Sequence, residues 1–262
     1  MKIIISLLFI ALISASTLNW KEIDDGMYVA EYHSPIKSSH DNSVITILKI
    51  NPKKYQLDVY SSFIGHTAEE WAVKENLIAV INPGMYNSQS KNMGFMKQYN
   101  NMFNPNFNND KAILCFNPKN NSLPPSQIID REFQDWKTLV NQYESCSQSI
   151  RMVDFNGNNK WSKQAKKWSM VVVAMDKDGN ILFIHSRSPY EVRQFIDILL
   201  KAPLNIKNMM YLEGGPEASL YVNHNGYAAR KIGSYETGFY EFNDNTELWP
   251  IPNVIGVKKK TP

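Results

Sequence analysis

Two short segments of the chain place glycine and polar residues directly after an apolar run. One covers residues 78–87 and continues from Ile-Ala-Val-Ile into Asn-Pro-Gly-Met-Tyr-Asn; the other covers residues 211–221 and reads Tyr-Leu-Glu-Gly-Gly-Pro-Glu-Ala-Ser-Leu-Tyr. Glycine has no Cβ, so the backbone can turn sharply and approach a ligand closely. A carboxylate at the end of a buried strand is held by a rigid element, as a catalytic group must be. Glu213 is therefore the candidate catalytic carboxylate, and Asn82 is the candidate polar group at the other strand end.

The order of these two segments resembles that of the phosphodiester glycosidase family. The resemblance extends from about residue 44 to about residue 221, and the second segment is its most specific part. This family includes the mammalian enzyme that removes a covering N-acetylglucosamine to expose mannose 6-phosphate on lysosomal proteins, and many bacterial exported proteins. The resemblance implies an exported glycoside hydrolase that cleaves a sugar-1-phosphate (phosphodiester) linkage in an envelope or extracellular glycan. It implies no cofactor; a divalent cation that bridges phosphate and carboxylate stays open, although no metal-ligand spacing is present.

The resemblance also implies a set of site residues. Residues 82–87 match the family's asparagine–glycine–aromatic signature, and the backbone N–H groups after Glu213 could orient sugar hydroxyls or phosphate oxygens. We expect a catalytic group that consists of Glu213, Arg151 and Asn82, and a substrate-binding group that consists of Gly84, Tyr86, Asn87, Ser186, Gly214, Gly215 and Ser219.

Two departures from the family pattern indicate a divergent subfamily. The family usually has Leu-Asp-Gly-Gly where this chain has Glu213, and one added methylene matters because catalytic geometry is sensitive to displacements of about 1 Å. The family also tends to place an arginine at the start of the strand that here begins near Trp168, so Arg151 is the best substitute for a phosphate clamp. The alternative function is a non-catalytic glycan- or glycolipid-binding envelope protein with a degenerate site.

The reaction that the resemblance implies passes through an oxocarbenium-like state, which a nearby carboxylate stabilises. Glu213 would serve as nucleophile, base or electrostatic stabiliser, and Arg151 would hold the phosphate through two parallel hydrogen bonds. A second acid is harder to assign. Glu217 lies close in sequence and Asp154 is another candidate, but no pattern selects between them.

The N-terminus has the organisation of a secretory signal. Lys2 gives a positive start, residues 3–13 are apolar except for one serine, and small residues follow at 14–16. The apolar run is shorter than the ~20 residues that a membrane-spanning helix needs, so no stable membrane insertion is expected. The sequence predicts a signal peptide over residues 1–16 and a secreted or periplasmic domain over residues 17–262, with its core at about 44–257.

Composition restricts the partners. The net charge of +3 is too small to favour nucleic acid, and no basic stripe is present, so the expected partner is a carbohydrate or glycan phosphodiester of undetermined identity. The chain has two cysteines, Cys115 and Cys146, which could close a disulfide in an oxidising compartment. Two free thiols are the alternative.

Strands and helices alternate without a regular βαβ order, which predicts an α+β domain. The expected strands include residues 44–50, 55–60, 77–81 and 209–212, and a hairpin of 168–175 with 181–185 around an Asp-Gly turn. A helix should follow Thr67, which forms a capping box with Glu70.

Two further helices and a lid are expected. Helical spacing of apolar residues predicts one helix over residues 131–143, and the Ser-Pro-Tyr-Glu sequence at 188–191 predicts the start of another. Residues 87–109 are rich in asparagine and aromatics, which is typical of a long surface loop or lid. Their aromatic side chains would either stack on sugar rings or fix the loop to the core.

Overall fold

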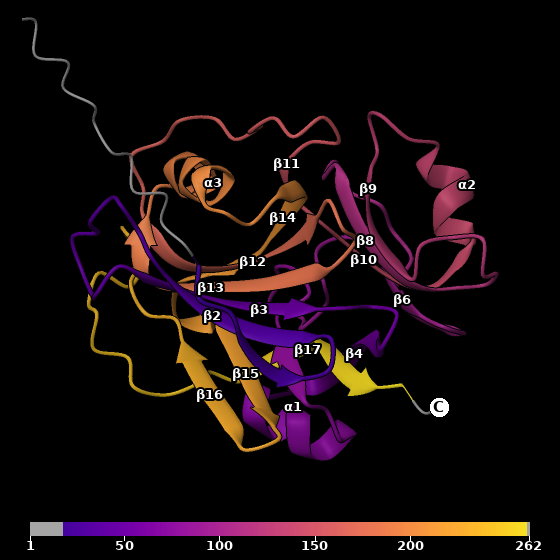
Figure 1. Ribbon diagram of the computed structural model, residues 1–262, viewed down its shortest axis with the longest axis horizontal. Coiled ribbons are helices and arrows are strands. Elements are labelled where there is room, and N and C mark those ends of the chain that lie inside the picture. The colour runs from indigo at the N-terminus through magenta and orange to yellow at the C-terminus, as the bar shows by residue number, and fades with distance from the viewer. Residues whose placement is uncertain (1–17, 261–262) are drawn as a thin grey trace, which may run out of the picture.

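The fold is known from a computed structural model that describes residues 18–260 (Figure 1). The expected signal peptide, residues 1–16, lies outside the described residues. Among residues 18–260, no helix is both long and apolar enough to cross a lipid bilayer. Among the described residues nearly half lie in strands and three short α-helices pack against the sheets, which confirms a single α+β domain.

The largest sheet has seven strands in the order β1-β2-β3-β13-β12-β14-β11, and every neighbouring pair is antiparallel. The predicted hairpin forms its centre. The strands are β1 (Lys21–Asp24), β2 (Met27–His33), β3 (Val44–Ile50), β11 (Arg151–Val153), β12 (Trp168–Asp176), β13 (Ile181–Tyr190) and β14 (Ile206–Gly214).

Two five-stranded antiparallel sheets complete the fold. The first runs β7-β6-β10-β8-β9 and consists of β6 (Met96–Gln98), β7 (Asn101–Asn104), β8 (Ala112–Pro118), β9 (Ser126–Asp130) and β10 (Tyr143–Ser149). The second runs β16-β15-β5-β17-β4 and consists of β4 (Tyr55–His66), β5 (Ala79–Ile81), β15 (Ser219–His224), β16 (Tyr227–Ile232) and β17 (Ile251–Lys259).

One apolar core joins the three sheets. Val171 and Leu212 of the seven-stranded sheet pack in the same buried cluster as Leu114 of the first five-stranded sheet and Ile81 of the second. Side chains alternate between the two faces of a strand, so the opposite face of the large sheet needs its own cover. The helix α3 (Val192–Lys201) supplies it, and Figure 1 shows this helix lying across that face.

The helices only partly follow the sequence expectations. The helix α1 (Ala68–Glu75) starts after Thr67 with the predicted capping box. The predicted helix over 131–143 is shorter, because α2 (Trp136–Asn141) begins only after Asp135, whose side chain accepts a hydrogen bond from the backbone N–H of Thr138. The predicted start of α3 at residues 188–191 was wrong. Strand β13 continues to Tyr190, and Glu191 caps the helix.

The stretch 87–109 is not a free lid. It contains β6 and β7, which pair with each other and extend a sheet through β10. Phe95 is buried in a cluster with Ile113 and Tyr143, and the ring of Phe107 stacks on the ring of Phe95 with centroids 4.2 Å apart. The alternative in which the aromatics fix this segment to the core is therefore confirmed for these two residues.

The predicted disulfide is present. Cys115 of β8 and Cys146 of β10 are paired across the two strands, and their sulfur atoms are bonded. The bond closes a loop with a sequence separation of 31 residues. In the chain-entropy model such a loop stabilises the folded state by roughly 3–4 kcal/mol.

Candidate active site

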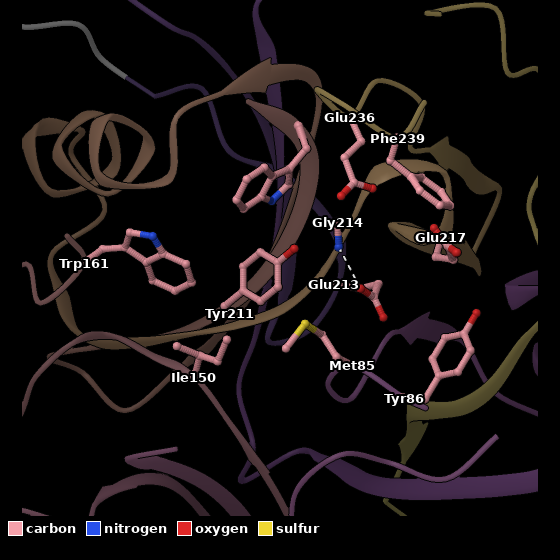
Figure 2. A pocket seen from close by; sticks show the side chains of 11 residues that line it. Met85, Tyr86, Ile150, Trp161, Tyr211, Glu213, Gly214, Glu217, Glu236 and Phe239 are labelled. Atoms are coloured by element: carbon pink, nitrogen blue, oxygen red, sulfur yellow. Dashed lines mark hydrogen bonds between the residues drawn. The ribbon is translucent and has the colours of Figure 1, made fainter. Parts of the chain in front are cut away.

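The end of β14 borders a cavity of about 480 Å³. The short 3₁₀ turn η1 (Gly215–Glu217) follows this strand, and the irregular stretch 233–250 passes beside it. Figure 2 shows the rings of Trp161 and Tyr211 on one side of the cavity and the three carboxyl groups, with Phe239 and Tyr86, on the other. The lining consists of Met85, Tyr86, Ile150, Trp161, Trp168, Tyr211, Glu213, Gly214, Glu217, Glu236 and Phe239.

Glu213 lies in this cavity, partly buried, as the last side chain of β14. Its Oε1 accepts a hydrogen bond from the backbone N–H of Gly214 at 3.0 Å. Burial, with smaller contributions from the negative charges of Glu217 and Glu236, raises the pKa of Glu213 to about 8. The carboxyl group is therefore mainly protonated at neutral pH and can donate a proton.

Two more carboxylates face the same cavity. Burial raises the pKa of Glu217, and the charge of Glu236 adds to that effect. Burial also raises the pKa of Glu236, while the positive charge of Lys166 opposes the increase. The sequence offers Glu217 as a candidate second acid but does not mark Glu236, because Glu236 lies in an irregular stretch with no motif around it.

Gly214 and Gly215 make this arrangement possible. A Cβ on Gly214 would overlap the hydroxyl of Tyr211 and lie 2.5 Å from Cδ1 of Trp168. Gly215 has φ +64°, and a Cβ there would lie 2.6 Å from Oε2 of Glu236 and 3.6 Å from Oε2 of Glu217. Gly214 thus lets Tyr211 and Trp168 approach the backbone, and Gly215 lets the carboxylate of Glu236 do so.

The aromatic part of the lining comes from several elements. Tyr86, a predicted site residue, lies at the cavity, and burial followed by the charges of Glu217 and Glu213 raises its pKa. Sequence reasoning missed Trp161, Trp168, Tyr211 and Phe239. Tyr211 stands two residues before Glu213 on the same strand, so alternation along β14 could have selected it, whereas the other three lie on separate segments and only proximity in space selects them.

Asn82 and Ser219 do not line the cavity; they support the turn beside it. The Asn82 side chain is buried, donates to the carbonyl of Glu217 at 3.1 Å and accepts from the backbone N–H of Ser219 at 2.9 Å. The Ser219 hydroxyl donates to the same Glu217 carbonyl at 3.0 Å. Both residues therefore fix the backbone that carries Glu217.

Gly84, Asn87 and Ser186 also lie outside the lining. A Cβ on Gly84 would be 3.2 Å from Oδ1 of Asn92, so glycine lets this loop pack closely. Asn87 is exposed, and its Oδ1 accepts from two backbone N–H groups of its own turn. Ser186 is buried and donates to the carbonyl of Ser188 at 2.8 Å. These three shape loops and strand ends, and no contact places them at the cavity.

Arg151 is directed away from Glu213. It is paired with Met210, whose side chain lies in the core between the sheets, whereas its neighbour Ile150 reaches the cavity. The guanidinium lies 2.7 Å from Oδ1 of Asp130 and 2.8 Å from Oε2 of Glu132. Arg151, the expected phosphate clamp, therefore does not meet Glu213. Side chains alternate between the two faces of a strand, so Ile150 points to the cavity and Arg151 points away from it.

No lysine or arginine of the described residues lines the cavity. Within the same part of the chain, no group of three or more His, Cys, Asp or Glu side chains has the geometry to hold a metal ion. Trp168 contributes a buried indole N–H that lies beside the Tyr211 hydroxyl and makes no hydrogen bond of regular geometry within residues 18–260. The cavity therefore offers carboxyl groups, aromatic faces and neutral N–H and O–H donors.

A β-rich domain with carboxyl groups in an aromatic cavity has the general features of a carbohydrate-active protein. The family model for phosphodiester glycosidases matches residues 75–258, and the chain belongs to this family.

Two solved structures share its fold. One is the catalytic domain of zebrafish N-acetylglucosamine-1-phosphodiester alpha-N-acetylglucosaminidase, auto-inhibited by its pro-peptide. It has 12% sequence identity and a TM-score of 0.63 over 93% of this chain and 88% of that one. The other is a hypothetical protein from Synechocystis with 13% identity and a TM-score of 0.61, over 94% of this chain and 64% of that one. No protein of curated function matches the chain.

Proposed function

We propose that the protein is an exported phosphodiester glycosidase that hydrolyses the bond between a sugar's anomeric carbon and a phosphate oxygen. The observation that carries this proposal is the state of Glu213: a carboxyl group on the end of a rigid strand, in an aromatic cavity, with a pKa raised to about 8 by burial. Such a group is protonated at neutral pH and can act as a general acid.

In the proposed reaction, Glu213 donates its proton to the phosphate oxygen as the bond to the anomeric carbon breaks. The bonding electrons stay with that oxygen, so a phosphomonoester leaves and an oxocarbenium-like sugar remains. A water molecule then adds to the anomeric carbon and gives its proton to an ionised carboxylate. Glu236 is our candidate for this base, because it lines the cavity and the charge of Lys166 partly offsets the rise in its pKa that burial causes.

Substrate binding would rest on the neutral lining. The indole N–H of Trp168, which makes no well-aligned hydrogen bond within residues 18–260, and the hydroxyl of Tyr86 can donate to phosphate oxygens without a cationic clamp. The rings of Trp161 and Tyr211 offer apolar faces for a sugar ring. Asn82 is assigned a positioning function in place of direct catalysis, because its contacts fix the backbone of Glu217.

Export is supported by the disulfide between Cys115 and Cys146, since such bonds persist mainly in oxidising compartments.

A second candidate function is a glycan-binding protein without catalysis. The observation that favours it is the lack of any lysine or arginine in the cavity lining of the described chain.

The test is hydrolysis of a panel of sugar-1-phosphodiesters by the purified mature protein and by Glu213→Gln, with release of free sugar as the readout. The proposal predicts turnover that Glu213→Gln reduces by roughly 10²–10⁴-fold while its thermal melt is retained. If both proteins bound glycans and neither turned over any substrate, the enzyme hypothesis would be rejected in favour of the glycan-binding protein.

A further inference from the structure

The charge of the cavity constrains what it can hold. Its lining contains Glu213, Glu217 and Glu236, and none of these forms an ion pair with any residue between 18 and 260. Among the described residues, Lys166 is the cation that lowers the pKa of Glu236, and it does not line the cavity. Carboxylates without a counter-charge are costly to keep ionised in a buried site. A cationic ligand would remove that cost, and a neutral sugar would not.

The aromatic lining has a second, independent preference. The faces of tryptophan, tyrosine and phenylalanine carry negative electrostatic potential and attract cations within about 6 Å of the ring. Rings of Trp161, Trp168, Tyr211, Tyr86 and Phe239 border the same cavity. Rings on several sides of one space, combined with carboxylates, form the environment in which proteins bind ammonium groups.

Phe239 adds a detail at the cavity mouth. Its side chain is 70% exposed although it borders the cavity, and it follows Glu236 by three residues in the same irregular stretch. Figure 2 shows its ring on the same side of the cavity as Glu236 and Glu217. A ligand amine held by these two carboxylates would therefore also meet the face or edge of this ring.

We infer that the sugar bound in this cavity is an amino sugar with a free, protonated amine, held by Glu217 and Glu236 and by the surrounding aromatic rings. The inference rests on the proposed function for the reaction, but it concerns recognition and stands on the cavity itself. An amino sugar 1-phosphodiester carries one positive and one negative charge, so its amine can meet the two carboxylates while its phosphate meets Trp168, Tyr86 and the protonated Glu213. An N-acetyl group would remove the positive charge and add bulk at that position.

The experiment is a calorimetric titration of the mature protein at pH 7 with two matched probes, glucosamine 1-phosphate and N-acetylglucosamine 1-phosphate. We expect the free amine to bind about tenfold more tightly, as one cation–aromatic and carboxylate contact would give. The double variant Glu217→Gln, Glu236→Gln should remove the preference, whereas Glu213→Gln should retain it. A near-ultraviolet circular dichroism spectrum shows whether each variant keeps its aromatic packing.

Equal binding of the two probes, tighter binding of the acetylated probe, or binding of neither would overturn the inference. So would a preference that survives in the folded double variant. Hydrolysis is measured separately, which keeps the two proposals distinguishable. Preference for the amine without turnover of any phosphodiester would support the amino-sugar inference and reject the proposed enzymatic activity. Turnover of acetylated substrates without that preference would support the enzymatic activity and reject the amino-sugar inference.

Discussion

The ends of β5 and β14 have similar sequences and different functions in the structure. Each is an apolar strand followed by a polar residue and glycine, yet Asn82 at the end of β5 is buried in hydrogen bonds while Glu213 at the end of β14 faces a cavity. One strand end thus holds the site together, and the other supplies its acid. Similar local sequence is therefore not enough to assign a catalytic function to a strand end.

Sheet position explains the difference. Strand β5 lies between β15 and β17, so its end is enclosed by neighbours on both sides. Strand β14 has the short β11 as one neighbour, and β11 pairs only with Met209 and Met210. The last residues of β14 therefore extend past β11, and the space beside them is the cavity.

The largest contrast should come from the two polar residues themselves. Glu213→Gln should lower kcat/KM by roughly 10²–10⁴-fold, because it removes the proton donor but keeps the shape of the side chain. The free energy of unfolding should change little, since amide and protonated carboxyl are similar in size. Kinetics on a sugar-1-phosphodiester combined with urea unfolding measures both quantities. Full activity in this variant would contradict the assignment of Glu213, at the end of β14, as the general acid.

Arg151→Met tests whether the arginine beside β14 contributes to stability and not to catalysis. The guanidinium is in a buried ion pair with Asp130, so its removal should cost about 3–5 kcal/mol of unfolding free energy and leave kcat/KM of the folded protein unchanged. Lys231→Met is the matched control, because its pair with Glu31 is more exposed and should cost about 0–1 kcal/mol. A large loss of kcat/KM with normal stability would mean that Arg151 contacts the substrate after all.

Gly214→Ala tests the close packing at the cavity wall. The new methyl group would overlap the Tyr211 hydroxyl and press on Trp168, so we expect a loss of about 1–3 kcal/mol and a clear fall in activity. Gly179→Ala is the control for adding a methyl group where there is room, because nothing lies within 4 Å of the added Cβ; unlike Gly214, which is extended with φ −134°, Gly179 has φ +86°. It should cost about 1 kcal/mol of stability and keep full activity. Similar kinetics for both variants would show that the wall tolerates a side chain.

Asn82→Ala tests the strand end that positions the site without reacting in it. It leaves the buried backbone N–H of Ser219 without its acceptor, which costs about 1–3 kcal/mol, and it loosens the backbone of Glu217. Activity should fall less than in Glu213→Gln. Asn87→Ala, in an exposed turn, is the control with little change in either quantity. If Asn82→Ala abolished turnover at unchanged stability, Asn82 would belong with the reacting groups.

The sequence predicted the elements whose causes are local. The capping box at Thr67 and Glu70, the Asp-Gly hairpin and the buried strand before Glu213 each follow from neighbouring residues. The helix start at Ser188 failed because pairing of β13 with β12 extends the strand to Tyr190, which local capping signals cannot show.

The site was predictable only in part. Glu213, Gly214 and Tyr86 stand in a recognisable motif and lie at the cavity. Glu236 and Phe239 come from an irregular stretch that the fold brings to the end of β14, so no spacing in the sequence marks them. Arg151 was selected by charge and position, but the direction of its side chain depends on strand register.

The most direct test of the central claim is a carbon-13 carboxyl titration of the mature protein, with Glu213→Gln to assign the resonance. Because burial raises the pKa of Glu213, the folded state favours its protonated form; the associated stability is present at low pH and is lost as pH rises through about 8. We predict a midpoint near 8 and a matching fall of kcat/KM on the alkaline side. A midpoint in the usual range of a glutamate would contradict the assignment of Glu213 as the general acid.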